Sequence, residues 1–280
     1  MALVSSHLEA FLAVSQTLNF TKAADVLHIT QSALSQRIIN LEEELATTLF
    51  IRDRSGLKLT ETAVKLLHYC KIKNNLEDEF IHSLKSQNSN ELAGLVRIGG
   101  FSSVMASLVV PALVPLAKDH AKVKIQTFTR EVDDLFAMLT RGEIDYMLLD
   151  DRFEKENLER ILLGHEVNFL VQNPRCKNED VYLDHDEKDQ VTLAYFKKYK
   201  IKPEKFERHY LDDVYGLISG VKAGLGRAIL PRHLIKGQKD IVNVGTKNSL
   251  DIPVYLYYYA RPYYTKLHHR IVEDLKKIVF

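Results

Sequence analysis

Apolar side chains in the first 45 residues recur every three or four positions, which is the period of an amphipathic helix. Three such runs are separated by short polar or β-branched segments, and they cover residues 8–15, 23–27 and 34–45. A side chain that can cap a helix precedes the second run at Asn19 or Thr21 and the third at Thr30 or Ser32. The pattern predicts three short helices, with the last two joined by the tight turn of a helix-turn-helix.

The pattern then changes twice. Residues 50–59 surround a Ser-Gly pair and predict a two-stranded hairpin, which is the wing of a winged helix. Residues 60–89 return to helical spacing with one narrow apolar stripe, and this favours a long helix that pairs with a second copy over a core helix. Residues 87–91 have the composition of a linker.

From about residue 92 the chain alternates short apolar strands with helices. The predicted strands cover residues 95–99, 123–128, 145–149, 167–171, 191–195 and 254–258. The predicted helices cover residues 107–119, 133–141, 214–223 and 264–280. This alternation is typical of a doubly wound α/β architecture.

Composition and the start of the chain exclude several classes of protein. The chain has 280 residues, of which 46% are hydrophobic and 27% charged, so it is a folded protein of two or three domains. Its two cysteines cannot form a disulfide framework. No run approaches the length of a membrane helix, and the first residues lack the basic segment of a secretory signal. We therefore expect a cytoplasmic protein that has no membrane partner.

Motifs of catalysis are absent from the sequence. We find no Gly-x-Ser-x-Gly elbow, no phosphate-binding glycine loop and no metal-ligand spacing. Asp184-His185-Asp186 is a loop-like trio that we do not assign to a metal. The expectation is a protein without catalytic residues, metal or cofactor.

Hydrogen-bonding side chains gather at the start of the third predicted helix, where helix-turn-helix proteins read base edges. Arginines in the predicted wing are placed to contact phosphates. The predicted DNA-binding residues are Lys22, Thr30, Gln31, Ser32, Ser35, Gln36, Arg37, Arg52 and Arg54. Five cations and six anions give residues 1–60 a net charge of −1, so composition alone does not indicate DNA binding.

These N-terminal residues resemble the LysR-type transcriptional regulators. The resemblance is carried at fixed spacing by Asn19-Phe20-Thr21, Ala23-Ala24, Thr30 through Gln36, Leu49-Phe50 and Leu59-Thr60. Further along, Arg141 through Asp145 and Gly224 through Pro231 are similar to turns of that family's effector domain. Two glycines usual in the family, after Leu45 and after Thr60-x-x-Ala63, are Ala46 and Val64 here.

The resemblance implies an α+β winged helix-turn-helix domain over residues 1–60, a linker and dimerisation helix over 61–89, and an α/β effector domain over 92–280. It divides the effector domain into lobe I, about residues 92–163 and 240–280, and lobe II, about 164–239. It also implies a homodimer or homotetramer that binds an interrupted dyad in double-stranded DNA. An unknown small-molecule effector would bind between the lobes and control it.

Candidate effector contacts follow the carboxyl ends of predicted strands, where clefts of α/β folds open. They are Ser102, Ser103, Thr129, Asp150 and Asp213. Helix capping is the alternative role for the two serines and for Asp213. If the acids face the cleft, a cationic or amino-bearing effector is favoured. The alternative function is a small-molecule sensor whose DNA binding is degenerate, and the negative N-terminal domain keeps that alternative open.

Overall fold

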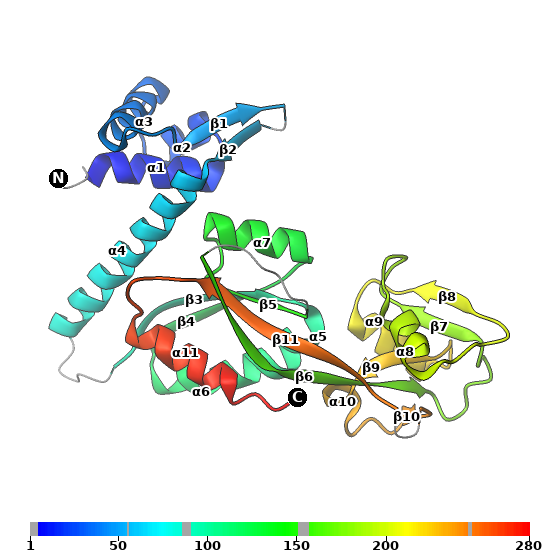
Figure 1. Cartoon of the computed structure of the whole chain (residues 1–280). Coiled ribbons are helices and arrows are strands. Elements are labelled where there is room, and N and C mark those ends of the chain that lie inside the picture. The colour runs from blue at the N-terminus through cyan, green and yellow to red at the C-terminus, as the bar shows by residue number, and fades with distance from the viewer. Residues whose placement is uncertain (1–4, 55, 86–90, 151–156, 246–247) are drawn as a thin grey trace.

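The computed structural model describes residues 5–54, 56–85, 91–150, 157–245 and 248–280. Three parts follow one another along the chain: a small helical domain, a long helix α4 (Glu61–Lys85), and a larger α/β domain of two lobes (Figure 1). Both expected fold classes, the winged helix-turn-helix and the two-lobed α/β domain, are confirmed.

The N-terminal domain forms because three amphipathic helices bury their apolar faces together. Its elements are α1 (Ser5–Thr17), α2 (Phe20–Val26), α3 (Gln31–Leu45), β1 (Phe50–Asp53) and β2 (Gly56–Leu59). Asn19 caps α2 and Thr30 caps α3, each through a side-chain oxygen that accepts a backbone N–H. Phe11, Leu34 and Leu41 are fully buried at the centre of this domain. The antiparallel pair β1–β2 is the wing.

Helix α3 ends at one of the positions where the family's glycine is replaced. Ala46 has a left-handed backbone with φ of 49°, and its N–H closes the helix on the Glu43 carbonyl. A Cβ is unfavourable in this conformation, which explains why a glycine is usual there. The Glu42 side chain secures the following turn by accepting the N–H of Leu49 at 2.6 Å.

Helix α4 packs against both domains. Thr60 caps it, and its first turns bury Ala63, Leu66, Leu67 and Cys70 in the core of the N-terminal domain. On another face, the ring of His68 packs against the Tyr259 ring with centroids 3.7 Å apart and a tilt of 38°, and Lys71 donates to the Gly142 carbonyl. The apolar stripe that was predicted to pair with a second copy therefore packs partly against other elements of the same chain.

Lobe I is a sheet with helices on both faces (Figure 1). Its strands are β3 (Ala93–Gly100), β4 (Lys122–Thr129), β5 (Tyr146–Leu149) and parts of β6 (Leu158–Gln172) and β11 (Leu250–Tyr259), in the order β6-β11-β5-β3-β4. Strand β3 runs parallel to β4 and β5, whereas β11 is antiparallel to β5 and β6. One face is covered by the continuous helical segment α5 (Ser102–Val104), η1 (Met105–Val109) and α6 (Val110–Asp119) together with α11 (Lys266–Lys276). The other face is covered by α7 (Val132–Arg141).

Lobe II contains the end of β6, which pairs with β9 (Ala228–Pro231) and β10 (Val242–Asn243). The parallel pair β7 (Val181–Asp184) and β8 (Glu207–Tyr210) lies beside them. Its helices are α8 (Val191–Tyr199), α9 (Val214–Lys222) and α10 (Arg232–Ile235).

The prediction of a strand at residues 191–195 is wrong, because this segment is the start of α8. Its buried positions Thr192, Tyr195 and Phe196 follow helical spacing. The helix begins at Val191, whose N–H donates to the side chain of Asp189 at 2.8 Å. β-branched and aromatic residues favoured a strand, but this local cap and the burial of one helical face decided the structure.

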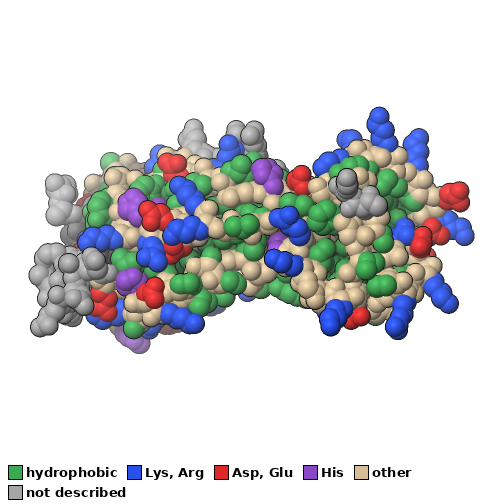
Figure 2. Space-filling model, turned by 90° about the horizontal axis from the view of Figure 1, so that it is seen from below, with side chains coloured by type: hydrophobic (Ala, Val, Ile, Leu, Met, Phe, Trp, Pro, Cys, Tyr) green, Lys and Arg blue, Asp and Glu red, His purple; other side chains and the backbone are tan. Residues whose placement is uncertain are grey.

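Strands β6 and β11 pass through both lobes as one antiparallel ribbon, and the molecule narrows around them when seen from below (Figure 2). The predicted lobe limits near residues 164 and 240 remain a proposal. The first lies within β6, where Gly164 pairs with Val254. Ile241 packs in the core of lobe II, so we place the return to lobe I within β11.

In the described part of the chain, one helical segment, Ser102–Asp119, is long and apolar enough to cross a membrane by length and composition. Core helices of globular proteins pass the same test. Val109, Leu113 and Leu116 of this segment are fully buried in the core of lobe I. This is weak evidence for a membrane span.

Candidate functional site

The first candidate surface is the start of α3. Gln31, Ser32 and Gln36 are exposed, while Ser35 and Arg37 are partly buried. Thr30 is exposed, but its hydroxyl oxygen already accepts the N–H of Ala33 at 3.2 Å. The structure therefore brings these residues together on the first two turns of α3, with Thr30 in a capping role.

The wing supplies the cations of this surface. Arg52 and Arg54 are exposed on or beside β1, and the Arg52 guanidinium lies 5.9 Å from the centre of the Phe20 ring. Lys58 is paired with Asp53 at 2.6 Å, whereas Arg54 has no hydrogen bond or ion pair with any residue that the structure describes. Lys22 is exposed in the first turn of α2. Contact of these residues with DNA remains a prediction.

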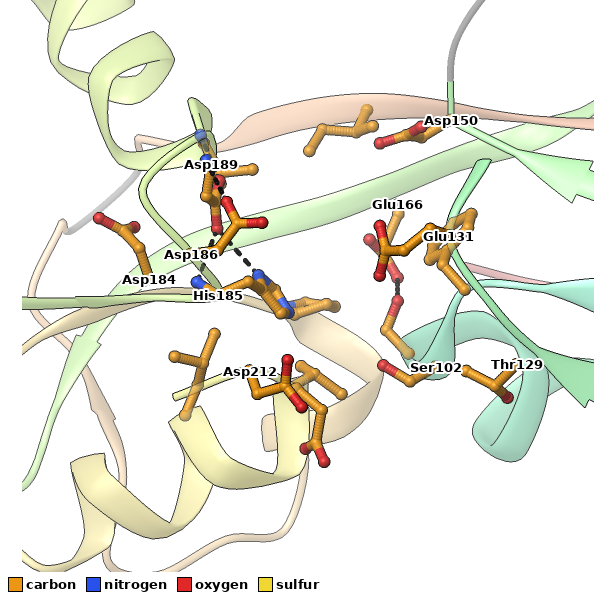
Figure 3. A pocket seen from close by; sticks show the side chains of 18 of the residues that line it. Ser102, Thr129, Glu131, Asp150, Glu166, Asp184, His185, Asp186, Asp189 and Asp212 are labelled. Atoms are coloured by element: carbon orange, nitrogen blue, oxygen red, sulfur yellow. Dashed lines mark hydrogen bonds and ion pairs between the residues drawn. The ribbon is translucent and has the colours of Figure 1, made fainter. Parts of the chain in front are cut away.

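The second candidate site is a cavity of about 430 Å³ between the two lobes. All five predicted effector residues line it: Ser102, Ser103, Thr129, Asp150 and Asp213. The first four come from the carboxyl ends of β3, β4 and β5, and the last precedes α9 on the opposite wall. The ends of lobe I strands and the loops of lobe II therefore face one another across the cavity (Figure 3).

Two of these five residues have structural duties. Ser103 donates its hydroxyl to Glu166 Oε1 at 2.8 Å. Asp213 Oδ1 accepts the N–H groups of Tyr215 and Gly216 at 2.6 and 2.8 Å, so it caps α9. Capping was the alternative weighed for Asp213. Binding of an effector by these residues remains a prediction.

Sequence reasoning missed Glu166, which stands at the base of the cavity on β6. Its side chain is only 6% exposed, and Oε1 accepts hydrogen bonds from Ser103 and from His233 Nε2, both at 2.8 Å. The signal was present in the chain. Glu166 and Asn168 are two apart within an apolar strand, and both line the cavity. Buried polar residues on one face of a strand indicate a site or a hydrogen-bonded network.

A loop of lobe II adds a group of acids around His185. The His185 ring lies 2.8 Å from Asp189 Oδ2. Burial lowers the pKa of His185, but the hydrogen bond to Asp189 and the nearby carboxylates raise it more, so the net shift is upward. Burial raises the pKa of Asp189, but hydrogen bonds from His185 and Val191 outweigh it and lower the pKa. In the part of the chain that the structure describes, no group of three or more His, Cys, Asp or Glu is arranged to hold a metal ion.

Comparison with known families bears on both surfaces. Residues 5–64 match the model of the bacterial regulatory helix-turn-helix protein, lysR family. Residues 89–277 match the LysR substrate binding domain, and this match covers more than half of the chain. The chain belongs to the LysR family. The relatives named in this comparison are transcriptional regulators, not enzymes.

Among related sequences, the LysR-family chain is similar to the HTH-type transcriptional activator IlvY of Haemophilus influenzae. The two are 33% identical over 165 residues, which are 58% of this chain and 54% of IlvY. The chain thus spans about half the length of the curated relatives that it matches.

Solved structures show the same fold over the whole length. ArgP of Mycobacterium tuberculosis superimposes with a TM-score of 0.76 at 19% identity, covering 98% of this chain and 97% of ArgP. Full-length LysG of Corynebacterium glutamicum, with bound effector Arg, has a TM-score of 0.76 at 16% identity, with coverage of 98% and 97%. At these identities the likeness shows the fold alone.

Proposed function

We propose that this LysR-family chain is a cytoplasmic, sequence-specific DNA-binding transcriptional regulator controlled by a small-molecule effector. The observation that carries the proposal is the joining of two surfaces in one chain. A capped helix presents unburied Gln and Ser side chains beside an arginine-bearing wing, and a two-lobed domain encloses a cavity. Helix α4 packs on both domains, so it connects them mechanically.

DNA recognition divides between the helix and the wing. Gln31, Ser32, Ser35 and Gln36 on α3 would contact base edges in the major groove, because their amides and hydroxyls both donate and accept. Lys22, Arg37, Arg52 and Arg54 would contact phosphates. Thr30 would act mainly by fixing the start of α3.

We further propose a homodimer or homotetramer on an interrupted dyad. Helix α4 supports this because apolar side chains on it remain exposed: Tyr69 is 50%, Leu76 38% and Ile81 44% exposed. Tyr69 and Leu76 are seven positions apart, so these two side chains lie on one face of the helix. A second copy of α4 would cover them and place two recognition helices about one turn of DNA apart.

The cavity would bind the effector, with Ser102, Ser103, Thr129, Asp150 and Asp213 among its contacts. The arginine bound to LysG supports a small molecule as the occupant of this fold's effector domain. Binding between the lobes, which the β6–β11 ribbon connects, would change their relative angle. The alternative is a small-molecule sensor with degenerate DNA binding, which the net charge of −1 over residues 1–60 favours.

Selection of the purified full chain on random duplex DNA, followed by a salt titration, tests the proposal. We expect an interrupted dyad. Gln31→Ala should lower discrimination between sequences, with the exposed Gln16→Ala as its control. Arg54→Ala should weaken binding to all duplexes and reduce the salt slope by about one, and Lys205→Ala in lobe II, which removes the same charge, should change neither. Weak binding with no enriched motif, with and without cell extract metabolites, would favour the sensor.

A further inference from the structure

The cavity between the lobes is strongly acidic. Eight carboxylates and one arginine line it among the described residues. Like charges so close together repel, and the repulsion grows when water is displaced and the local dielectric falls. Most acidic clusters satisfy themselves through local hydrogen bonds, so the acids that have no such partner decide what the cavity binds.

Four of these acids are committed to the protein itself. Asp184 pairs with Arg208 at 2.6 Å and accepts the Thr192 hydroxyl, and Asp189 pairs with His185. Asp186 accepts the backbone N–H groups of Lys188 and Asp189 at 2.7 and 2.9 Å. Asp213 caps α9 in the same way. These carboxylates hold loops of lobe II in place and do not need a ligand.

Three of the remaining four acids keep carboxylate oxygens available, and they come from different parts of the cavity. Glu131 lies at the start of α7 in lobe I, and Asp212 precedes α9 in lobe II. Both are exposed, and neither carboxylate has a hydrogen bond or ion pair with a described residue. Glu166 lies on β6, and all three side chains line the cavity (Figure 3).

Glu166 differs from the other two because it is buried. Its Oε1 accepts two hydrogen bonds, one from Ser103 and one from His233, while no described residue donates to Oε2. Its Oε2 is not closed off from solvent, so this oxygen is free to accept a hydrogen bond from a ligand in the cavity. A charged donor on a ligand satisfies this oxygen best, because hydrogen bonds between ionised groups are about twice as strong as neutral ones.

We propose that the cleft binds a small organic cation, an amine or guanidine, whose charged group is held by Glu166 Oε2. Glu131 from lobe I and Asp212 from lobe II add attraction from the two walls, so the cation reduces the repulsion between the lobes. An organic cation is favoured over a metal ion because no metal-holding group occurs among the described residues. The cavity of about 430 Å³ suits a molecule of this size. This inference rests on the proposed effector function of the cleft.

Arg130, the one arginine among the described lining residues, favours an anionic group on the ligand. It lines the cavity, and its guanidinium donates to its neighbouring Thr129 carbonyl at 2.7 Å, which leaves other N–H groups to face an anion. An effector that carries a carboxylate as well as an amine could use both groups. An effector that is only an anion would contradict the proposal.

Isothermal titration calorimetry on the full chain tests the charge of the ligand. The probes are 1,5-diaminopentane, agmatine, L-lysine and L-arginine as cations, glutarate and succinate as anions, and calcium and magnesium chloride as metals. We expect at least one organic cation to bind. The proposal is overturned if none of the cations binds at millimolar concentration, or if only the dicarboxylates or the metal ions bind.

Variants then identify the anchor. Glu166→Gln should weaken cation binding by about ten- to a hundredfold, because one ionised hydrogen bond is lost. Glu187→Gln is the matched control, since Glu187 lies in the same acidic loop but does not line the cavity. Asp212→Asn is a second test that removes an exposed charge without disturbing the core, and it should weaken binding less. Unchanged affinity in Glu166→Gln would refute the anchor.

Failure here and failure of the proposed function are distinguishable. An interrupted dyad selected from random DNA would stand even if no cation binds. Conversely, if a cation binds but no DNA motif is enriched, the inference about the ligand holds and the protein is the small-molecule sensor.

Discussion

His68 provides the sharpest test of how α4 is docked on the effector domain. Its ring is enclosed between α4 and β11, and neither ring nitrogen has a hydrogen-bond partner among the described residues. Burial, followed by the positive charges of Lys71 and Arg261, lowers the pKa of His68 to about 3. Only the neutral imidazole therefore suits the docked helix.

The sign of the pH dependence follows from the two states. In the unfolded chain His68 takes up a proton as the pH falls below its ordinary pKa of 6.5, whereas the folded chain does so only near pH 3. Stability is thus lost on acidification between these values. Each pH unit below 6.5 costs about 1.4 kcal/mol, so His68 alone should remove about 2 kcal/mol at about pH 5.

Urea unfolding followed by far-UV circular dichroism measures this loss, since the chain has no tryptophan. His68→Phe keeps a ring against Tyr259 but cannot bind a proton. Between about pH 7 and pH 5 the wild type should lose about 2 kcal/mol more than this variant. His268, whose pKa is also lowered to about 3, is present in both proteins and cancels. The exposed His28→Asn should behave as the wild type does. Parallel pH profiles of His68→Phe and wild type would refute the docked, neutral His68.

Two backbone substitutions should act in opposite directions, and thermal unfolding measures both. Ala46→Gly should stabilise the chain by about 0.5–1 kcal/mol, because it relieves a left-handed residue at the end of α3; a lower melting temperature would contradict that strain. Gly216→Ala in α9 should destabilise by about 1 kcal/mol or more, although alanine favours helices, because its Cβ would lie 2.5 Å from the Leu211 carbonyl oxygen.

Local signals made the N-terminal domain predictable. The capping side chains Asn19 and Thr30 and the helical spacing of apolar residues act within a few positions, so they are visible in the chain itself. The prediction of a strand at residues 191–195 was wrong because β-branched and aromatic residues in a short apolar run do not distinguish a strand from a buried helix. Its helix depends on Asp189 and on which face packs against lobe II.

The cavity was predictable only in part, for a related reason. The carboxyl ends of strands follow from topology, and these gave Ser102, Ser103 and Thr129. Glu166 lies within a strand, and its partners Ser103 and His233 are distant in sequence. The contact between the His68 and Tyr259 rings also joins distant residues. Such pairings depend on the tertiary fold and leave no local pattern.

The position of β11 has a consequence for synthesis of the protein. This strand lies between β5 and β6 in the sheet of lobe I, yet it belongs to the last part of the chain. Domains fold as units in the order in which they leave the ribosome, so the winged helix is complete while lobe I still lacks a central strand. Under the proposed function, a gene truncated before residue 250 would encode a DNA-binding domain without a complete effector domain. Such a fragment would compete with the intact regulator for its operator, and the truncated allele would be dominant.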